Sequence, residues 1–231
     1  MSLVYLIPAP LHEETLAPLP SYVLTAIQAC NILFVENERT ARRYLKKLDK
    51  NIVIDHFEWH VMSKENNHYL TAFQKHLKGD ATIGIISEAG CPGIADPGQM
   101  LVAAAHRTGV LVKPLVGPSS ILLALMASGM NGQQFQFHGY LPIEISKKLK
   151  KIRQIEEMIR VQGSTHIFIE TPYRNHQLLE TLLQHCQHAT KLCIAVDITA
   201  PTEWIFTTEI KNWKQKKIDL HKRPAIFLLG Q

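Results

Sequence analysis

The sequence predicts an α/β protein of two α/β domains, with a mainly parallel sheet in the first domain and a mixed sheet in the second. The strand candidates are short runs that are apolar throughout, which is typical of strands covered by helices on both faces. In residues 1–130 these runs alternate strictly with helical segments, as in a doubly wound domain. In residues 131–231 the alternation breaks down, so we expect a second domain there.

The first domain has strand candidates separated by helical segments with recognisable start and stop signals. The apolar runs are 3–7, 32–35, 52–54, 82–86 and 110–115. The segment 38–48 places Ala41, Leu45 and Leu48 at helical spacing. Residues suited to starting the other helices are Ser21, Ser63, Pro97 and Pro118, and residues suited to ending them are Gly79, Gly109 and Gly129.

The second domain follows a turn or linker at residues 129–132. Its strand candidates are 135–137, 166–169, 191–198, 203–207 and 225–229. A long basic helix is expected from Ile145 to Gln162, closed by Gly163, and another helix after Pro172. We expect the strands at 203–207 and 225–229 to pair antiparallel, which would make this sheet mixed.

Composition narrows the class of protein. A hydrophobic content of 46% and a charged content of 19% are typical of a folded globular chain. The first residues lack the positively charged start of a signal peptide. No apolar run approaches the roughly 18–20 residues of a membrane span. The four cysteines lack the spacing of a disulfide framework. We expect a cytoplasmic protein with reduced thiols, and the net charge of +5 mildly favours an anionic partner.

The segment Ser87–Gly98 is the strongest candidate for a binding loop. It follows a strand candidate and precedes a helix, the place where open α/β sheets bind ligands. Three glycines and two prolines in twelve residues predict an irregular loop that a ligand can approach closely. The spacing excludes a dinucleotide fingerprint and a phosphate loop. A second candidate is Gly117–Ser120, which is equally well interpreted as an ordinary helix cap.

Two further features, a trio of histidine and glutamate residues and a set of basic runs, are weaker candidates for a functional site. His56, Glu58 and His60 alternate along an extended segment, but a polar sheet edge explains them better than a metal site, so we expect no metal. Basic residues gather at 39–47, 147–153 and 211–217, usually a sign of solvated helix faces. Because Tyr44 and Trp213 are interleaved with two of these runs, phosphate contact combined with base stacking is the alternative.

At this point the sequence motifs together resemble a known family. Ser87–Gly98 resembles the S-D-A-G-T-P-G-I-S-D-P-G loop of the tetrapyrrole methylase superfamily, in particular its branch of small-subunit ribosomal RNA ribose 2′-O-methyltransferases. Further segments resemble the motifs of this branch in the same order along the chain. They are residues 36–40 (E-D-T-R-T), 114–119 (P-L-P-G-P-S), 128–129 (S-G), 137–142 (F-x-G-F-L-P), 170–174 (E-S-P-H-R) and 223–230 (P-A and an apolar run).

The resemblance implies an S-adenosylmethionine-dependent methyltransferase that binds its donor in the cleft between two α/β domains, in a homodimer acting on small-subunit ribosomal RNA. The residues implied in donor binding are Pro8, Pro10, Glu88, Ala89, Gly90, Gly93, Ile94, Ala95, Gly117, Ser119, Glu170, Thr171, Pro224 and Ala225. Arg39, and with it Arg174, is a candidate for holding a phosphate or the acceptor. Glu36 or Asp96 is a candidate for accepting the proton of the acceptor hydroxyl.

The chain also departs from the family pattern in ways that leave alternatives open. Residues 9–13 replace T-P-I-G-N and place His12 where a glycine is expected. Asn37 stands for an aspartate, and residues 196–200 lack two cations of the family's R-E-L-T-K. One alternative is methylation of a small molecule such as a tetrapyrrole. Another is a non-catalytic relative that binds the methyl donor.

Overall fold

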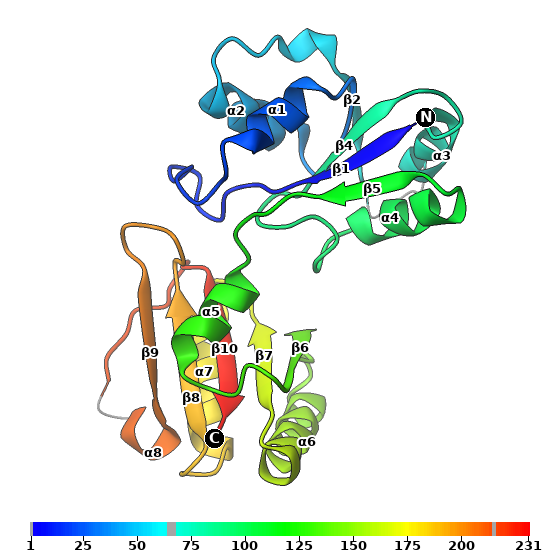
Figure 1. Ribbon diagram of the computed structural model, residues 1–231. Helices are drawn as coiled ribbons and strands as arrows, with labels where there is room; N and C mark the ends of the chain where they lie inside the picture. The colour runs from blue at the N-terminus through cyan, green and yellow to red at the C-terminus, as the bar shows by residue number, and fades with distance from the viewer. Residues whose placement is uncertain (1, 64–67, 214–215) are drawn as a thin grey trace. The chain divides into compact units, whose positions relative to one another are not determined.

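The computed structural model describes residues 2–63, 68–213 and 216–231, and the chain divides into two compact units, residues 1–119 and 120–231 (Figure 1). The boundary lies before helix α5 (Ser120–Ser128), whereas the sequence placed it at residue 130. Helix α5 packs against strands of the second sheet, so it belongs to the second unit. Among the described residues, no helix is both long enough and apolar enough to cross a membrane.

The first unit contains a parallel sheet in the order β3-β2-β4-β1-β5. Its strands are β1 (Leu3–Ile7), β2 (Ile32–Val35), β3 (Glu58–Val61), β4 (Thr82–Ile86) and β5 (Leu111–Pro114). The described pairings are all parallel, which confirms the predicted first sheet. The expected strand at 52–54 is wrong, because a 3-10 turn, η1 (Ile54–His56), follows there and the strand begins at Glu58. This edge strand is partly exposed, so it lacks the apolar run of a buried strand.

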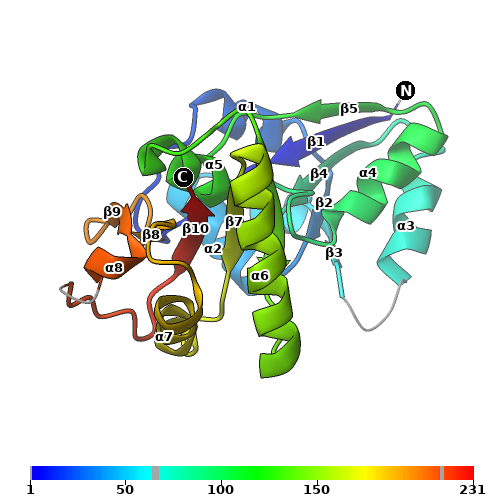
Figure 2. The same ribbon diagram turned by 90° about the horizontal axis from the view of Figure 1, so that it is seen from below.

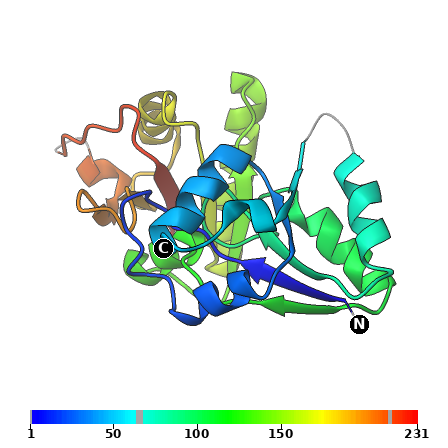
Figure 3. The same cartoon turned by 90° about the horizontal axis from the view of Figure 1, so that it is seen from above.

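Helices cover both faces of the first sheet. Helices α1 (Tyr22–Gln28) and α2 (Glu38–Leu48) share one apolar core with Ile7, Leu33 and Ile86. Helices α3 (His68–His76) and α4 (Gly98–Arg107) share another with β-strand residues such as Ile83 and Ile85. Figures 2 and 3 show the two pairs of helices on opposite sides of the sheet. This layering is the doubly wound arrangement that the alternating pattern predicted.

The helix starts in the first unit agree only partly with the predicted caps. Ser21 stands at the start of α1, but its side chain makes no capping hydrogen bond. Asn37 caps α2, since its side chain accepts a hydrogen bond from the backbone N–H of Thr40 at 3.2 Å. Ser63, the predicted cap of α3, precedes residues 64–67, which lie outside the described residues.

The second unit contains a mixed sheet in the order β6-β7-β10-β8-β9. Its strands are β6 (Phe135–Tyr140), β7 (Thr165–Ile169), β8 (Lys191–Val196), β9 (Trp204–Glu209) and β10 (Ala225–Gly230). Strand β6 runs parallel to β7, and the other pairings are antiparallel, which confirms the predicted mixed sheet. The expected pairing of the strands at 203–207 and 225–229 is wrong. The short connection after β8 returns β9 directly alongside β8, so β8 separates β9 from β10.

Helices also flank the second sheet. Helix α6 (Ile145–Gln162), α7 (Asn175–His185) and the short α8 (Ile210–Trp213) contribute to one core with Phe168, Phe227 and Leu229. Figure 1 shows α5 in front of this sheet and α7 behind it. Helix α6 ends as predicted at Gly163, which takes the left-handed conformation (φ 62°) that a helix C-terminus favours.

Candidate functional site

The loops that follow β1, β4 and β5 meet at the carboxyl ends of these strands. Ala9 and Gly90 form an isolated antiparallel bridge between the first two loops. Gly117 packs so closely on Pro8 that a Cβ atom at position 117 would lie 2.1 Å from the Cβ of Pro8, so the third loop requires glycine there. The structure therefore brings Pro8, Gly90 and Gly117 together, as the sequence predicted. The connections from β1 and β4 lead to opposite sides of the sheet, the topological position where α/β sheets bind ligands.

The loop between β4 and α4 is held in a fixed shape by its own hydrogen bonds. Oδ1 of Asp96 accepts the backbone N–H groups of Gly93 (2.7 Å) and Gly98 (2.8 Å). The hydroxyl of Ser87 donates to the carbonyl of Gly90 at 3.1 Å. Glycines at positions 90 and 93 take positive φ angles, and so does Ala95 (φ 62°). A backbone held in this way can present its outer side to a ligand without reorganising.

The outer side of this loop is the part that remains accessible. Glu88, Ala89 and Ala95 are exposed, and Ile94 is 55% exposed. Small and apolar side chains beside exposed backbone groups suit a ligand that combines an aromatic base with hydroxyl and carboxylate groups. These four residues are therefore the part of the loop that a ligand such as S-adenosylmethionine can reach. Two further candidates, Pro10 and Ser119, are half-buried in the adjoining loops.

Asp96 is placed to shape the loop, and its environment perturbs its acidity. Burial raises the pKa of this carboxyl group, and the hydrogen bonds from Gly93 and Gly98 oppose that shift. Oδ2 of Asp96 is buried and has no hydrogen-bond partner within the described part of the chain. The sequence proposed Asp96 as a proton acceptor, and the structure adds that its Oδ1 atom fixes the loop.

A pocket of about 110 Å³ lies beside the loop, entirely within the first unit. It is enclosed by the loop after β1, the end of β2, one face of α2 and the start of the loop after β4. Charged and polar residues of its lining are Glu13, Glu36, Asn37, Thr40, Arg43, Tyr44, Lys47, Ser87 and Glu88. Both signs of charge therefore line this pocket, which suits a polar ligand.

Hydrogen bonds connect the pocket wall to the loops. The carboxylate of Glu36 accepts a hydrogen bond from the backbone N–H of Glu88 at 2.9 Å. This candidate proton acceptor therefore also positions the loop between β4 and α4. The hydroxyl of Tyr44 donates to the carbonyl of Pro8 at 2.8 Å. Burial raises the pKa of Tyr44, which favours the protonated hydroxyl that donates this hydrogen bond.

Sequence reasoning missed the face of α2 that lines the pocket. Thr40, Tyr44 and Lys47 follow one another at helical spacing on this face. The sequence identified the helix and its basic run but assigned only the neighbouring face, at Ala41 and Leu45, to the core. The spacing could have revealed this face, because a narrow polar stripe beside the apolar face of a helix lies at the edge of the surface that the helix covers.

Arg39 is the predicted acceptor-binding residue that the structure leaves available. It is exposed on α2, and it forms no ion pair within the described ranges. Its neighbour Arg42 differs, since it pairs with Glu38 at 2.6 Å and lies over the ring of Trp59 at 5.2 Å. Arg39 therefore offers a guanidinium group that an incoming phosphate can contact without breaking an ion pair.

In the second unit, the residues at the end of β7 and the start of β10 lie side by side. Ile169 and Ile226 face each other across the two strands, so Glu170 and Thr171 lie next to Pro224 and Ala225. The sequence predicted that these segments contribute to donor binding. These residues all belong to the second unit.

The side chain of Glu170 is engaged within the protein. Its Oε1 atom accepts hydrogen bonds from the backbone N–H of Thr171 (2.8 Å) and from Nε (3.0 Å) and Nη2 (2.6 Å) of Arg174. The buried Nζ atom of Lys148 lies 3.8 Å from Oε2. Arg174 is therefore committed to Glu170, and the expectation that it holds a phosphate finds no support in this geometry.

The proposed base-stacking role of two aromatic residues is wrong. Tyr44 is buried, and Trp213 is only 1% exposed. Nε1 of Trp213 donates to the carbonyl of Leu192 at 3.0 Å, and its ring packs against Trp204 and Phe206. The basic run 211–217 around Trp213 includes residues 214 and 215, which lie outside the described residues. Both rings instead belong to apolar cores, Tyr44 in the first unit and Trp213 in the second.

The chain was compared with known families and proteins. Residues 5–213 match the model of the family described as Tetrapyrrole (Corrin/Porphyrin) Methylases. Ribosomal RNA small subunit methyltransferase I of Vibrio cholerae is 29% identical over 203 residues, which cover 88% of this chain and 67% of that protein. The protein of the same name from Escherichia coli O157:H7 is 27% identical over 229 residues, which cover 98% of this chain and 77% of that protein.

Solved structures share the fold at low sequence identity. Diphthine synthase superposes with a TM-score of 0.70 at 11% identity, covering 100% of this chain and 90% of that chain. The uroporphyrin-III C-methyltransferase of Thermus thermophilus, solved in complex with S-adenosylhomocysteine, superposes with a TM-score of 0.58 at 16% identity, covering 99% and 97%. The family match identifies an S-adenosylmethionine-dependent methyltransferase. The chain belongs to the tetrapyrrole methylase family.

Proposed function

We propose that this methyltransferase methylates the 2′-hydroxyl of a ribose in small-subunit ribosomal RNA. The observation that carries the proposal is the similarity, over most of the chain, to proteins named ribosomal RNA small subunit methyltransferase I. Solved structures of the fold include enzymes with other acceptors, so the fold alone does not select the acceptor. A homodimer, which the resemblance implies, and a cytoplasmic location, which the composition favours, are part of the same proposal.

The surface of α2 supports an RNA acceptor. Arg39, Arg42 and Arg43 gather beside Glu38 on this helix, and Arg43 also lines the pocket next to the donor loop. RNA binding draws much of its affinity from phosphate contacts of this kind. In this proposal Arg39 contacts an RNA phosphate and thereby holds the ribose near the loop that binds the donor.

The residues of this chain contribute mainly by positioning. S-Adenosylmethionine supplies a methyl group on a sulfonium centre, which is transferred by in-line displacement. The exposed backbone of Glu88 to Ala95 holds the donor, and Glu36 fixes Glu88 through its backbone N–H. Glu36 and Asp96 are the two candidates for taking the hydroxyl proton, and burial raises the pKa of Asp96.

Two departures from the family pattern are compatible with this proposal. Asn37 caps α2 through its side chain, a task in which asparagine and aspartate are equivalent. Val196 and Ala200, which stand where the family has cations, are buried. The connection between them is closed by Arg223, whose Nε atom lies 2.8 Å from Oδ2 of Asp197. This segment is therefore stabilised from inside the unit.

The test is methyl transfer from radiolabelled S-adenosylmethionine to small ribosomal subunits isolated from cells that lack ribose methylation. Label that stays on the ribose after nucleolytic digestion of the small-subunit RNA supports the proposal. Parallel reactions with uroporphyrinogen III examine the small-molecule alternative, and transfer to that acceptor alone overturns the RNA assignment. Calorimetric titration with the donor completes the test. Donor binding without transfer to any acceptor favours a non-catalytic relative.

A further inference from the structure

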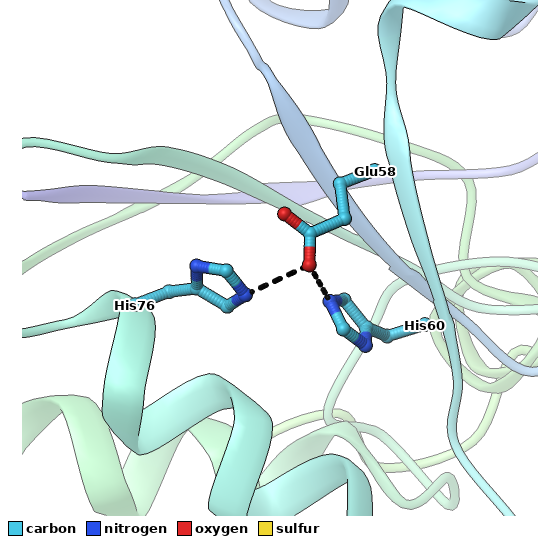
Figure 4. A group of neighbouring side chains, drawn as sticks. All are labelled: Glu58, His60 and His76. Atoms are coloured by element: carbon cyan, nitrogen blue, oxygen red, sulfur yellow. Dashed lines mark hydrogen bonds and ion pairs between the residues drawn. The ribbon is translucent and has the colours of Figure 1, made fainter.

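Glu58, His60 and His76 form a cluster of side chains on the first unit (Figure 4). Nε2 of His60 lies 2.9 Å from Oε1 of Glu58, and Nε2 of His76 lies 3.1 Å from the same oxygen. One nitrogen or oxygen atom from each residue lies within 4.8 Å of the others. Figure 4 shows both imidazole rings directed at the carboxylate, one from strand β3 and one from helix α3.

The fold holds the cluster in place. Glu58 and His60 are two residues apart on β3, so their side chains lie on the same face of the strand. The ring of His60 stacks on the buried ring of Phe34 with centroids 4.6 Å apart, which fixes its orientation. His76 comes from the last turn of α3. The side chains of His60 and His76 are each 20% exposed, so the cluster is accessible at one side.

We propose that Glu58, His60 and His76 bind a divalent transition metal ion, with Zn²⁺ as the preferred occupant. Two imidazole nitrogens and one carboxylate oxygen are ligands that Zn²⁺ favours. A tetrahedral zinc ion at about 2.0–2.2 Å from each ligand separates the ligand atoms by roughly 3.3–3.6 Å. The two contacts to Oε1 therefore need to widen by a few tenths of an ångström. Water completes the coordination on the exposed side.

The sequence analysis considered a different trio and interpreted it as a polar sheet edge, with no metal expected. Alternation along the chain grouped His56 with Glu58 and His60 and gave no reason to include His76. In the structure His56 ends the 3-10 turn before β3 and is not part of the cluster, although it lines the same surface hollow as Glu58 and His76. Because His56 shares this hollow but does not belong to the cluster, it supplies a matched control.

The metal site lies at the opposite end of the strands from the donor loop. Glu58 is in register with Ile32, the first residue of β2. The pocket beside the donor loop begins at Val35 and Ile86, the last residues of β2 and β4. A bound ion therefore ties the edge strand β3 to α3 and stabilises the first unit, without contact to the methyl donor.

The experiment uses the whole chain after removal of metals with a chelator. Zn²⁺ is titrated calorimetrically, and Co²⁺ is added to a second sample because its visible absorption reports the number and type of ligands. One saturable site per chain and a thermal midpoint that rises with Zn²⁺ are expected. Glu58→Gln and His76→Gln should each weaken binding at least as much as the roughly 10- to 100-fold loss seen when an outer-sphere partner is removed. His56→Ala should bind like the wild type.

A loss of metal binding must be distinguished from a loss of folding. Circular dichroism of each variant shows whether it is folded, and two independent substitutions protect against misinterpreting one unstable protein. The absence of saturable Zn²⁺ binding in the wild type overturns the proposal. Zn²⁺ binding as tight as that of the wild type in both Glu58→Gln and His76→Gln also overturns it. A loss in His56→Ala as large as in His76→Gln also overturns it, because the ligand set would then be different.

Discussion

Ala9 and Gly90 exchange backbone hydrogen bonds, with the N–H of Ala9 2.9 Å from the oxygen of Gly90 and the N–H of Gly90 3.1 Å from the oxygen of Ala9. This bridge joins the loop after β1 to the glycine-rich loop after β4. It is intact even though His12, three residues after Ala9, replaces the family's glycine. His12 is half-buried, and its Nδ1 atom has no hydrogen-bond partner among the described residues. The replacement of glycine by His12 thus changes a side chain of the loop after β1 but leaves the bridge between Ala9 and Gly90 in place.

Gly90→Ala should weaken donor binding. Gly90 has a φ of +76°, where a side chain adds about 1–2 kcal/mol of strain, and its Cβ would lie 3.3 Å from the carbonyl oxygen of Pro118. Gly109→Ala is the control, because Gly109 has a φ of +71° but its Cβ would meet no atom within 4 Å. Both variants should lose stability in urea unfolding. Calorimetry with S-adenosylmethionine should show a loss of affinity for Gly90→Ala alone, and equal affinities would contradict this role of the bridge.

Arg39→Ala should reduce methyl transfer without changing donor affinity. Arg39 is exposed and forms no ion pair among the described residues, so its removal does not disturb the fold. A charge-assisted hydrogen bond to phosphate contributes about 1.5–3 kcal/mol, which corresponds to a loss of roughly tenfold or more in kcat/KM. Arg107→Ala, at the exposed end of α4, is the matched control. Unchanged transfer in Arg39→Ala removes this residue from the proposed acceptor site.

Asp96 should make the protein less stable as pH rises. Burial raises the pKa of Asp96 in the folded state, so its contribution to stability is complete below the ordinary value of 3.8 and is lost as pH rises through the raised value. Asp96→Asn keeps an oxygen that accepts from Gly93 and Gly98 but cannot ionise. Urea unfolding from pH 4 to pH 7 should therefore show wild type losing stability relative to Asp96→Asn. A parallel pH dependence of the two proteins would refute this assignment.

Asp96→Ala provides the complementary measurement. It removes the acceptor of two hydrogen bonds and leaves the backbone N–H groups of Gly93 and Gly98 without it, which should destabilise the fold by about 1–3 kcal/mol. If alanine and asparagine at this position behave alike in unfolding at pH 7, Oδ1 does not fasten the loop.

Glu170→Gln should destabilise the second unit through Lys148. Both residues are buried, and removing the carboxylate leaves a buried ammonium group unpaired, a change that costs about 3–5 kcal/mol. Adding Lys148→Met to the same chain removes that charge and should restore part of the stability. Glu157→Gln, which breaks an exposed pair with Arg160, should have little effect in the same unfolding assay. A double variant no more stable than Glu170→Gln would argue against this coupling.

The fold was predictable where local pattern and burial agree. Strands β1, β2 and β4 match their predicted bounds, because a strand buried on both faces must be apolar throughout. Helices α2 and α6 also match, since Ala41, Leu45 and Leu48 follow the helical period in α2 and Gly163 marks the end of α6. Residues 56–60 were interpreted only as a polar sheet edge, and the bounds of β3 were missed because its exposed and half-buried residues do not form a continuous apolar run. Strand order in the second sheet was missed because local pattern does not encode which strands become neighbours.

The candidate site was predictable only in part, because local pattern does not show which distant residues become neighbours. The glycine-rich loop is a local feature, and its spacing and resemblance identified it. The pocket face of α2 and the engagement of Glu170 by Lys148 depend on contacts between residues far apart in the sequence. His76 entered the cluster with Glu58 and His60 in the same way, through the packing of α3 against β3. No local period joins these residues, so only the folded chain shows them together.

Acid should destabilise the second unit through His138 and His166. Nε2 of His138 lies 2.8 Å from Nδ1 of His166, and the hydroxyl of Ser164 lies 2.9 Å from the other nitrogen of His166. Burial, together with Lys151 and His166, lowers the pKa of His138 to about 4 from 6.5. Stability from this neutral side chain is therefore complete above pH 6.5 and is lost as pH falls through 4. His138→Gln should flatten this loss in urea unfolding, whereas the exposed His106→Gln should not, and an unaltered slope in His138→Gln would contradict the assignment.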